Sequence, residues 1–206
     1  MCYRTKLNAK LSDIERTLEA RFIEPDAYKP QQEINAFTFS KTPVISDENQ
    51  GEIQMFNWGL IPFWAKDVKI KKMTLNAKIE TISEKPSFRN SVKKRCLIIA
   101  DGYYEWQWKD SKGKDKQKYL ITPTDQEIFA FAGIYSNWIN PQTNEALNTY
   151  SIVTTEANEL MSEIHNNKKR MPVVLKQQDH QAWLNGQDHS NFAFPYEVPL
   201  IATEVA

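Results

Sequence analysis

Residues 95–108 read Arg-Cys-Leu-Ile-Ile-Ala-Asp-Gly-Tyr-Tyr-Glu-Trp-Gln-Trp, and this stretch constrains the fold more than any other. Residues 95–100 form a short apolar run, which is typical of a strand buried on both faces. Residues 103–108 are aromatic and alternate in character, which predicts a second strand. The polar segment 110–116 contains Gly113 and predicts a hairpin loop that leads into a third strand.

The rest of the chain is also rich in predicted strands. Further strands are expected at residues 52–58, 118–122, 128–135, 149–154 and 171–175. Three short helices are predicted. The first begins near Ser12, which is a candidate N-cap because Glu15 follows three residues later. The second has Thr155 as its N-cap and runs to residue 164, and the third spans residues 178–184. Residues 23–52 look irregular, and residues 187–206 look like a loosely structured tail. We therefore expect one α+β domain over residues 1–206, built around an antiparallel, barrel-like sheet with a few short helices.

Composition excludes several classes of protein. The 206 residues are 41% hydrophobic and include six Trp, eight Tyr and ten Phe, which argues against a disordered chain. No apolar run approaches the roughly 18 residues needed to cross a bilayer, so no membrane partner is expected. No signal-like segment follows the N-terminus, and the only two cysteines do not suggest a disulfide framework. The two Cys and three His are not spaced like the ligands of a metal site, so no bound metal is expected. We expect a cytoplasmic monomer without cofactors.

A basic block lies in the middle of a chain whose net charge is zero. Residues 66–118 contain 15 basic and 7 acidic side chains, a net charge of +8, whereas the flanking segments carry −2 and −6. Such a block is either a set of solvated surface lysines or a positive surface for a polyanion. Trp58, Phe63 and Trp64 precede it, and aromatic rings beside basic residues suit single-stranded nucleic acid. Core packing is the alternative for each ring, and we favour it for Trp58.

Cys2 is the most informative single residue. If Met1 is removed, Cys2 becomes an N-terminal 1,2-aminothiol, with an ordinary amine pKa of about 7.7–8.0 and a thiol pKa of about 8.5. The amine can form a Schiff base with an aldehyde, and the thiol can then close a five-membered thiazolidine ring. The same pair could instead attack an acyl group, as in N-terminal-nucleophile hydrolases. The third interpretation is that Cys2 is an incidental second residue with no chemical role.

Three other residues could carry chemistry. Glu105 lies among aromatic residues, where desolvation would raise its pKa into a range useful for proton transfer. His165 follows a predicted helix, and Asn76 lies inside the basic block, where an amide can hold an oxygen or an amine without adding charge. Each has an ordinary structural alternative. His180 and His189 lie in polar sequence, and we interpret them as surface residues.

Taken together, the motifs resemble those of the SRAP family (SOS-response-associated peptidase), whose members process abasic sites. The resemblance runs from Cys2 to about Leu175 and depends on the order and spacing of its motifs. They are Met1-Cys-Tyr-Arg4, Trp58-Gly-Leu-Ile-Pro62, Asn76-Ala-Lys78 with Glu80, Pro86-Ser-Phe-Arg89, Arg95-Cys96 through Asp101-Gly-Tyr-Tyr-Glu-Trp106, and His165 followed by Arg170-Met-Pro172.

The resemblance implies a specific chemistry. Family members bind abasic sites in single-stranded DNA, and their N-terminal Cys forms a thiazolidine crosslink with the ring-opened sugar, which shields the lesion. Carried over by motif, Cys2 would be the nucleophile, with Asn76 positioning the terminus, Glu105 transferring protons and His165 holding or protonating the sugar oxygen. The residues implied to bind DNA are Arg4, Trp64, Lys78, Arg89 and Arg170. The resemblance also implies thiol autopeptidase activity, a possible AP-lyase-type activity and a location on the nucleoid when DNA is bound.

The chain departs from the family pattern at four places. Tyr3 replaces the usual Gly after the Cys, and Lys78 replaces an Arg, which removes a bidentate phosphate ligand. The usual Asn-x-Ala-Pro motif is incomplete around Asn35, because Ala36-Phe37-Thr38 follows without a proline. Four residues, Asn166-Asn-Lys-Lys169, separate His165 from the Arg-Met-Pro motif and make a longer loop that could shift the imidazole ring.

Two other functions remain open at this point. An N-terminal-nucleophile hydrolase acting on amides explains Cys2 and Asn76 but not the basic block. A plain single-stranded DNA-binding module explains the basic block and the aromatic rings but leaves Cys2 incidental. A crosslinking protein explains all of these features together.

Overall fold

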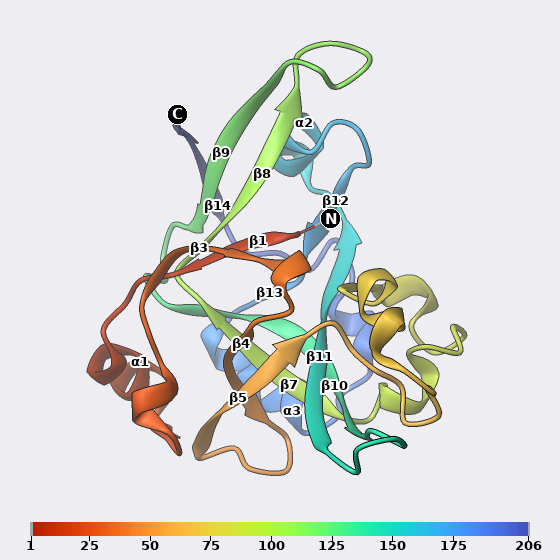
Figure 1. Cartoon of the computed structure of the whole chain (residues 1–206). Coiled ribbons are helices and arrows are strands. Elements are labelled where there is room, and N and C mark those ends of the chain that lie inside the picture. Colours follow the sequence, from red (N-terminus) through yellow and green to blue (C-terminus); the bar gives the residue numbers. More distant parts are fainter. Residues whose placement is uncertain (1, 206) are drawn as a thin grey trace.

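Five strands close on themselves to form the barrel-like core of the computed structural model, which describes residues 2–205 (Figure 1). Around the ring they are β11 (Ala146–Glu156), β10 (Phe129–Ile139), β7 (Arg95–Ala100), β4 (Lys41–Ser46) and β5 (Glu52–Trp58). Four of the pairings are antiparallel. The fifth joins β5 to β11 in parallel and closes the ring. The expected α+β fold with a barrel-like sheet is confirmed.

Short strands extend the barrel at its edges. β12 (Arg170–Pro172) and β6 (Asn76–Lys78) pair with β11, β13 (Val174–Leu175) pairs with β10, and β2 (Arg21–Phe22) pairs with β5. The sequence predicted one strand over residues 171–175. The structure divides it at Val173, which donates its N–H to Val153 and accepts the N–H of Ala132, so that the chain passes from β11 to β10.

A second, five-stranded sheet is antiparallel throughout. Its order is β14 (Leu200–Val205), β9 (Lys116–Pro123), β8 (Gly102–Trp108), β1 (Arg4–Leu7) and β3 (Gln31–Asn35). Asp101 lies where the chain leaves β7 in the barrel and enters β8 in this sheet. Its carboxylate accepts hydrogen bonds from Lys6 Nζ at 2.9 Å and from the backbone N–H groups of Asn8 and Ala9 at 2.7 and 2.8 Å. Asp101 therefore ties the end of β1 to the start of β8.

Helices are few and short. The α-helices are α1 (Leu11–Leu18), α2 (Glu159–Ile164) and α3 (His180–Leu184). The 3₁₀ turns are η1 (Pro25–Ala27), η2 (Ala36–Thr38), η3 (Val68–Met73), η4 (Ile79–Thr81), η5 (Arg89–Ser91), η6 (Gln177–Asp179) and η7 (His189–Phe192). Within residues 2–205, no helix has the length and apolar character needed to span a bilayer.

Several local predictions were wrong. The N-cap of α2 is Asn158, whose Oδ1 accepts the N–H of Met161, because Thr155 still belongs to β11. The N-cap of α1 is Lys10 rather than Ser12. Residues 23–52 contain β3 and β4, and the tail contains η7 and β14. Apolar and polar residues do not clearly alternate along β14, which is why its sequence did not predict a strand. β14 forms a strand because all six of its residues pair with the edge of β9.

Gly133 marks a place where the barrel is tightly packed. A Cβ on Gly133, in β10, would lie 2.5 Å from Ile98 Cδ1 and 2.7 Å from Cys96 Sγ. Because cores pack at crystal-like density, we predict that Gly133→Ala lowers the free energy of unfolding by about 1–3 kcal/mol. Gly51→Ala, with nothing within 4 Å of its Cβ, is the control and should change it by less than about 0.5 kcal/mol. Equal stabilities in urea titrations of the two variants would contradict this packing.

Candidate active site around Cys2

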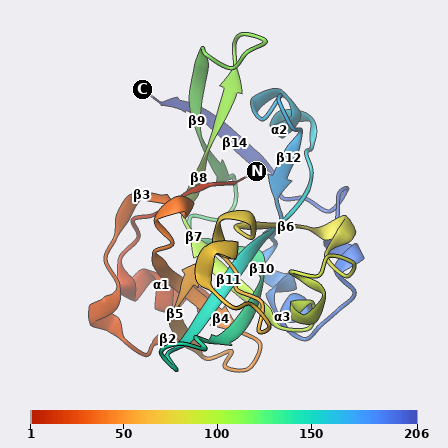
Figure 2. The same cartoon turned by 45° about the vertical axis from the view of Figure 1, so that its right-hand side comes forward.

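The first residues of the chain lie where the second sheet meets the edge of the barrel. In both views the start of β1 lies beside β12 (Figures 1 and 2). β1 pairs with β8 through Thr5–Tyr103 and Lys6–Gly102, so the chain before β1 runs alongside Glu105. β6, which begins with Asn76, and β12, which begins with Arg170, flank opposite sides of β11. Four distant segments of sequence therefore converge at the N-terminal end of β1.

Cys2 is fully buried, and its backbone carbonyl accepts a hydrogen bond from Asn76 Nδ2 at 2.9 Å. Burial, with a smaller contribution from the charge of Glu105, raises the pKa of the Cys2 thiol. The thiol is therefore held as S–H at neutral pH. The Oδ1 atom of Asn76 is buried and has no hydrogen-bond partner within residues 2–205. Asn76 thus holds the backbone of Cys2 with its N–H group while its amide oxygen can accept a further donor.

Glu105 and His165 face each other. Glu105 Oε2 lies 4.0 Å from His165 Nε2, and both side chains are almost completely buried. Burial raises the pKa of Glu105 to about 7 and lowers that of His165 to about 4. At neutral pH the Glu105 carboxyl group is therefore present in both its protonated and its ionised form, whereas the His165 imidazole is uncharged.

The tautomer of His165 follows from its backbone contact. His165 Nδ1 lies 2.8 Å from the carbonyl oxygen of Arg170 and 3.3 Å from the backbone nitrogen of Arg170. A carbonyl oxygen can only accept a hydrogen bond, so the shorter contact assigns the proton to Nδ1. With the proton on Nδ1, the lone pair is on Nε2, which faces Glu105. The carboxyl group and this lone pair are too far apart for a direct hydrogen bond, so together they can flank a reacting oxygen or nitrogen.

The longer loop after His165 keeps its position through the side chain of Asn166. Asn166 Oδ1 accepts the N–H of Trp108 at 3.1 Å, and its Nδ2 donates to the carbonyl of Trp108 at 2.9 Å. Gln107 adds a hydrogen bond to the carbonyl of Glu163 at 3.1 Å. These contacts tie the end of α2 and the loop to β8, two to three residues beyond Glu105. The extra loop length therefore does not separate His165 from Glu105.

Arg170 is committed to an internal ion pair. Both of its Nη atoms contact the Glu80 carboxylate at 2.8 Å, and Nη2 also contacts the carbonyl of Thr154 at 2.8 Å. Ion pairing with Arg170 offsets the desolvation of Glu80 and lowers the pKa of its carboxyl group. The guanidinium group that the resemblance implied would bind DNA is thus already paired with Glu80. Glu80 belongs to the same family motifs, but the sequence did not reveal this pairing.

The other expected DNA-binding residues are spread over the surface. Lys78, at the end of β6, and Arg89, at the start of η5, are exposed, and Trp64 is 47% exposed. Arg4 is partly exposed; it pairs with Glu33 and lies 5.9 Å from the ring centre of Trp106. The basic block is not wholly a surface feature, because Arg95 is buried over the ring of Trp183 at 4.0 Å.

The structure contradicts the prediction for His180 and confirms the prediction for Trp58. His180 was interpreted as a surface residue, which is wrong. It is 9% exposed at the start of α3, and burial lowers its pKa to about 4. The interpretation of Trp58 as a core residue is confirmed, because it is fully buried and donates to the carbonyl of Leu75 at 2.9 Å. Within the described part of the chain, no cluster of three His, Cys, Asp or Glu side chains could hold a metal ion.

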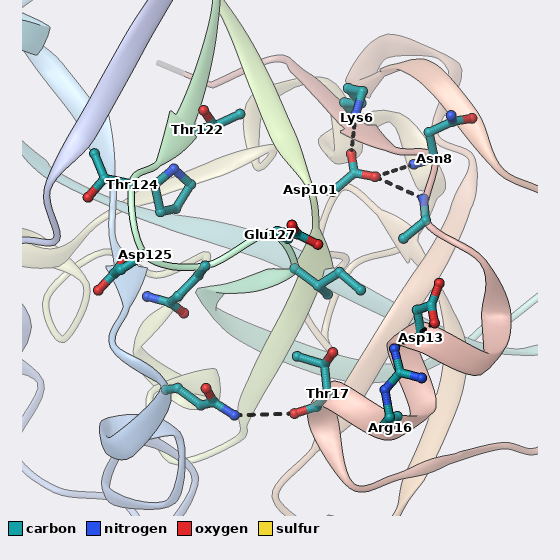
Figure 3. A pocket seen from close by; sticks show the side chains of 15 residues that line it. Lys6, Asn8, Asp13, Arg16, Thr17, Asp101, Thr122, Thr124, Asp125 and Glu127 are labelled. Carbon is teal, nitrogen blue, oxygen red and sulfur yellow. Dashed lines mark hydrogen bonds and ion pairs between the residues drawn. The ribbon is translucent and has the colours of Figure 1, made fainter.

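A broad hollow of about 870 Å³ lies elsewhere (Figure 3). It is lined by polar groups from α1, from the start of the chain and from the segment between β9 and β10, and none of Cys2, Asn76, Glu105 and His165 lines it. Asp101 in its wall is already satisfied by Lys6 and two backbone N–H groups. We therefore place the candidate chemistry at Cys2 and not in this hollow.

A family model described as "SOS response associated peptidase (SRAP)" matches residues 1–202. The chain belongs to the SRAP family. It is 41% identical over 187 residues to "Abasic site processing protein YoqW" of Bacillus subtilis, covering 90% of this chain and 80% of that protein. It is also 28% identical over 216 residues to "Abasic site processing protein HMCES" of Xenopus tropicalis, covering 85% and 63%. A crystal structure of a Bacteroides thetaiotaomicron protein superposes with a TM-score of 0.90 at 36% identity, covering 100% of this chain and 92% of that one.

The protonation state of His165 gives a direct test of this SRAP site. Because its pKa is lowered to about 4, the ring should remain neutral at pH 6, with its proton on Nδ1. Long-range ¹H–¹⁵N NMR distinguishes the two tautomers and the charged ring, and a His165→Gln variant assigns the signals. A charged ring or an Nε2–H tautomer at pH 6 would contradict the geometry described for Glu105 and His165.

Proposed function

We propose that this protein processes abasic sites in single-stranded DNA by joining Cys2 covalently to the ring-opened sugar. The observation that carries the proposal is the convergence of Asn76, Glu105 and His165 around the buried second residue. The names of its SRAP relatives support abasic DNA as the substrate. Met1 lies outside the described residues, and its removal, by the chain itself or by an aminopeptidase, is part of the proposal.

The proposed reaction begins with the amine of Cys2. Its nitrogen attacks the aldehyde carbon of the sugar and forms a carbinolamine, which loses one water to give an imine. Protonated Glu105 donates the proton that the departing hydroxyl needs, and a pKa near 7 suits that task at neutral pH. The thiol then adds to the imine carbon, its proton passes to the nitrogen, and a thiazolidine closes. Overall, one water is lost and no oxidant or reductant is consumed.

The raised thiol pKa favours this order of steps over a hydrolase mechanism. A thiol hydrolase needs a thiolate, and burial holds the Cys2 sulfur in its protonated form. In the crosslinking reaction the amine attacks first, and the thiol is needed only after a reactive imine has formed beside it. AP-lyase-type strand cleavage would follow only if the imine persisted long enough for β-elimination.

A basic and aromatic surface supports DNA as the partner. Phe63 and Trp64 are exposed, and the neighbouring turn η3 carries the exposed Lys69 and Lys72. Exposed rings beside cations are the combination that binds single strands by stacking and phosphate pairing. This surface alone would also suit a plain DNA-binding module. The buried arrangement around Cys2 is what favours covalent chemistry.

Replacing Cys2 separates the role of the amine from that of the thiol. Cys2→Ala keeps a small second residue and a reactive amine, so an imine should still form and be trapped by borohydride. Without sulfur no thiazolidine can close, and the adduct that survives heating should fall to a few per cent or less of wild type on denaturing gels. Cys96→Ala removes the other buried cysteine and should crosslink like wild type. A heat-stable adduct of Cys2→Ala at wild-type yield would show that Cys2 is not the nucleophile.

The role of Glu105 predicts a particular pH dependence. Its pKa is raised to about 7, so the acid form is present below that pH and is lost as pH rises through it. Glu105→Gln cannot supply the proton and should crosslink roughly 100-fold more slowly at pH 6. The ratio of wild-type to variant rates cancels the titration of the Cys2 amine, and it should fall as pH rises through about 7. A ratio that does not change between pH 5.5 and 8.5 would exclude Glu105 as the proton donor.

A further inference from the structure

Two of the four departures from the family pattern meet in space. Tyr3, which stands where the family has Gly, packs against Phe37, which lies in the segment where the family has Ala-Pro. The ring centres are 5.2 Å apart and the planes are tilted by 37°. The backbone joins the same two segments, because the N–H of Ala36 donates to the carbonyl of Tyr3 at 2.9 Å. A ring contact and a backbone hydrogen bond therefore both hold the Tyr3 and Phe37 segments together beside Cys2.

Phe37 is exposed on a turn whose backbone is held by side-chain hydrogen bonds. Its side chain is 53% exposed although it lies in η2, a turn fixed by side-chain hydrogen bonds. Asn35 Oδ1 accepts the N–H of Phe37 at 3.1 Å, and Thr38 Oγ1 donates to the carbonyl of Asn35 at 2.7 Å. A single exposed apolar residue is ordinary. An exposed ring on such a turn, packed at a tilt against the residue that follows Cys2, offers a surface for another flat apolar group.

The covalent step determines which flat group can reach this surface. Consecutive Cα atoms lie about 3.8 Å apart, so Tyr3 stays close to any sugar that Cys2 holds. Neighbouring nucleotides of one strand are spaced by about 3.4 Å along a duplex, and by more in a stretched single strand. The abasic nucleotide has no base of its own. A base from the adjacent nucleotide is therefore the nearest aromatic partner for the Tyr3–Phe37 pair.

We propose that the Tyr3–Phe37 pair is a stacking subsite for the nucleobase next to the abasic sugar, on one side of the lesion; this inference rests on the proposed function. The base lies against the exposed face of Phe37, while Tyr3 supports the ring from behind. The subsite makes binding depend on an intact base beside the lesion and disfavours sites where two abasic nucleotides adjoin.

The test uses a lesion analogue that has no aldehyde, so that binding is measured apart from crosslinking. Three labelled single strands carry one tetrahydrofuran abasic analogue. The first has bases on both sides, the second lacks the 5′ neighbouring base and the third lacks the 3′ neighbouring base. Fluorescence anisotropy gives Kd for wild type, Phe37→Ala and Phe37→Trp. Ile23→Ala is the matched control, because Ile23 is also 53% exposed but follows β2, away from the start of β1.

The proposal predicts a coupling between ring and base. On the strand with bases on both sides of the analogue, Phe37→Ala should raise Kd roughly 5- to 100-fold. On the same strand, Phe37→Trp should keep Kd within about threefold of wild type, and Ile23→Ala should leave Kd unchanged. On one of the two strands that lack a neighbouring base, wild type should already bind weakly and Phe37→Ala should weaken it no further.

Several results would overturn the proposal. A Phe37→Ala variant that binds the strand with bases on both sides like wild type excludes the subsite. An equal loss on all three strands shows that Phe37 acts without stacking on a base, which also excludes it. Wild type that does not bind the analogue strands at all overturns the subsite and leaves the covalent function to the crosslinking experiment. Failure to crosslink natural abasic DNA, with the predicted pattern of Kd values intact, overturns the covalent function alone.

Discussion

The antiparallel pairing of β1 with β8 is the constraint on which the site depends. Thr5 pairs with Tyr103 and Lys6 with Gly102, and Asp101 anchors this register by binding Lys6 and the turn that follows β1. A slip of one residue would turn every β8 side chain to the opposite face and remove Glu105 from Cys2. The same strand carries Gln107 and Trp108, which hold α2 and the loop that begins at His165. One strand pairing therefore positions Cys2 and Glu105 directly and, through α2 and its loop, His165.

Burial determines the chemistry more than any single charge does. It keeps the Cys2 thiol protonated, brings the pKa of Glu105 to about 7 and keeps His165 neutral. A protonated thiol is a poor nucleophile for amides, but it can add to an imine formed by its own amine. The site is thus better suited to an aldehyde than to a peptide bond. In the proposed reaction that aldehyde is the ring-opened sugar left where a base is missing from DNA, which links the environment of one cysteine to a particular lesion.

The sequence predicted the core strands of the fold because those depend on local patterns. The apolar run at residues 95–100 and the alternation that follows it specify β7 and β8 by themselves. Local patterns did not join Cys2, Asn76, Glu105 and His165 into one site; the order and spacing of motifs shared with the family did. Features that depend on distant partners were missed. β14 becomes ordered only against β9, Glu80 occupies the face of Arg170 expected to bind phosphate, and Asn166 compensates for a longer loop by binding Trp108. Periodicity contains no information about such pairings.

Peptide mass spectrometry can determine whether the sugar becomes attached to the amine and the thiol of Cys2. Wild-type protein is incubated with an abasic single strand, and the adduct is digested with nuclease and protease. We expect an N-terminal peptide that begins at Cys2, lacks Met1 and carries one sugar remnant with the loss of one water. Fragmentation should place the remnant on Cys2. An adduct on an internal lysine such as Lys78, or on a peptide that retains Met1, would contradict the proposed chemistry.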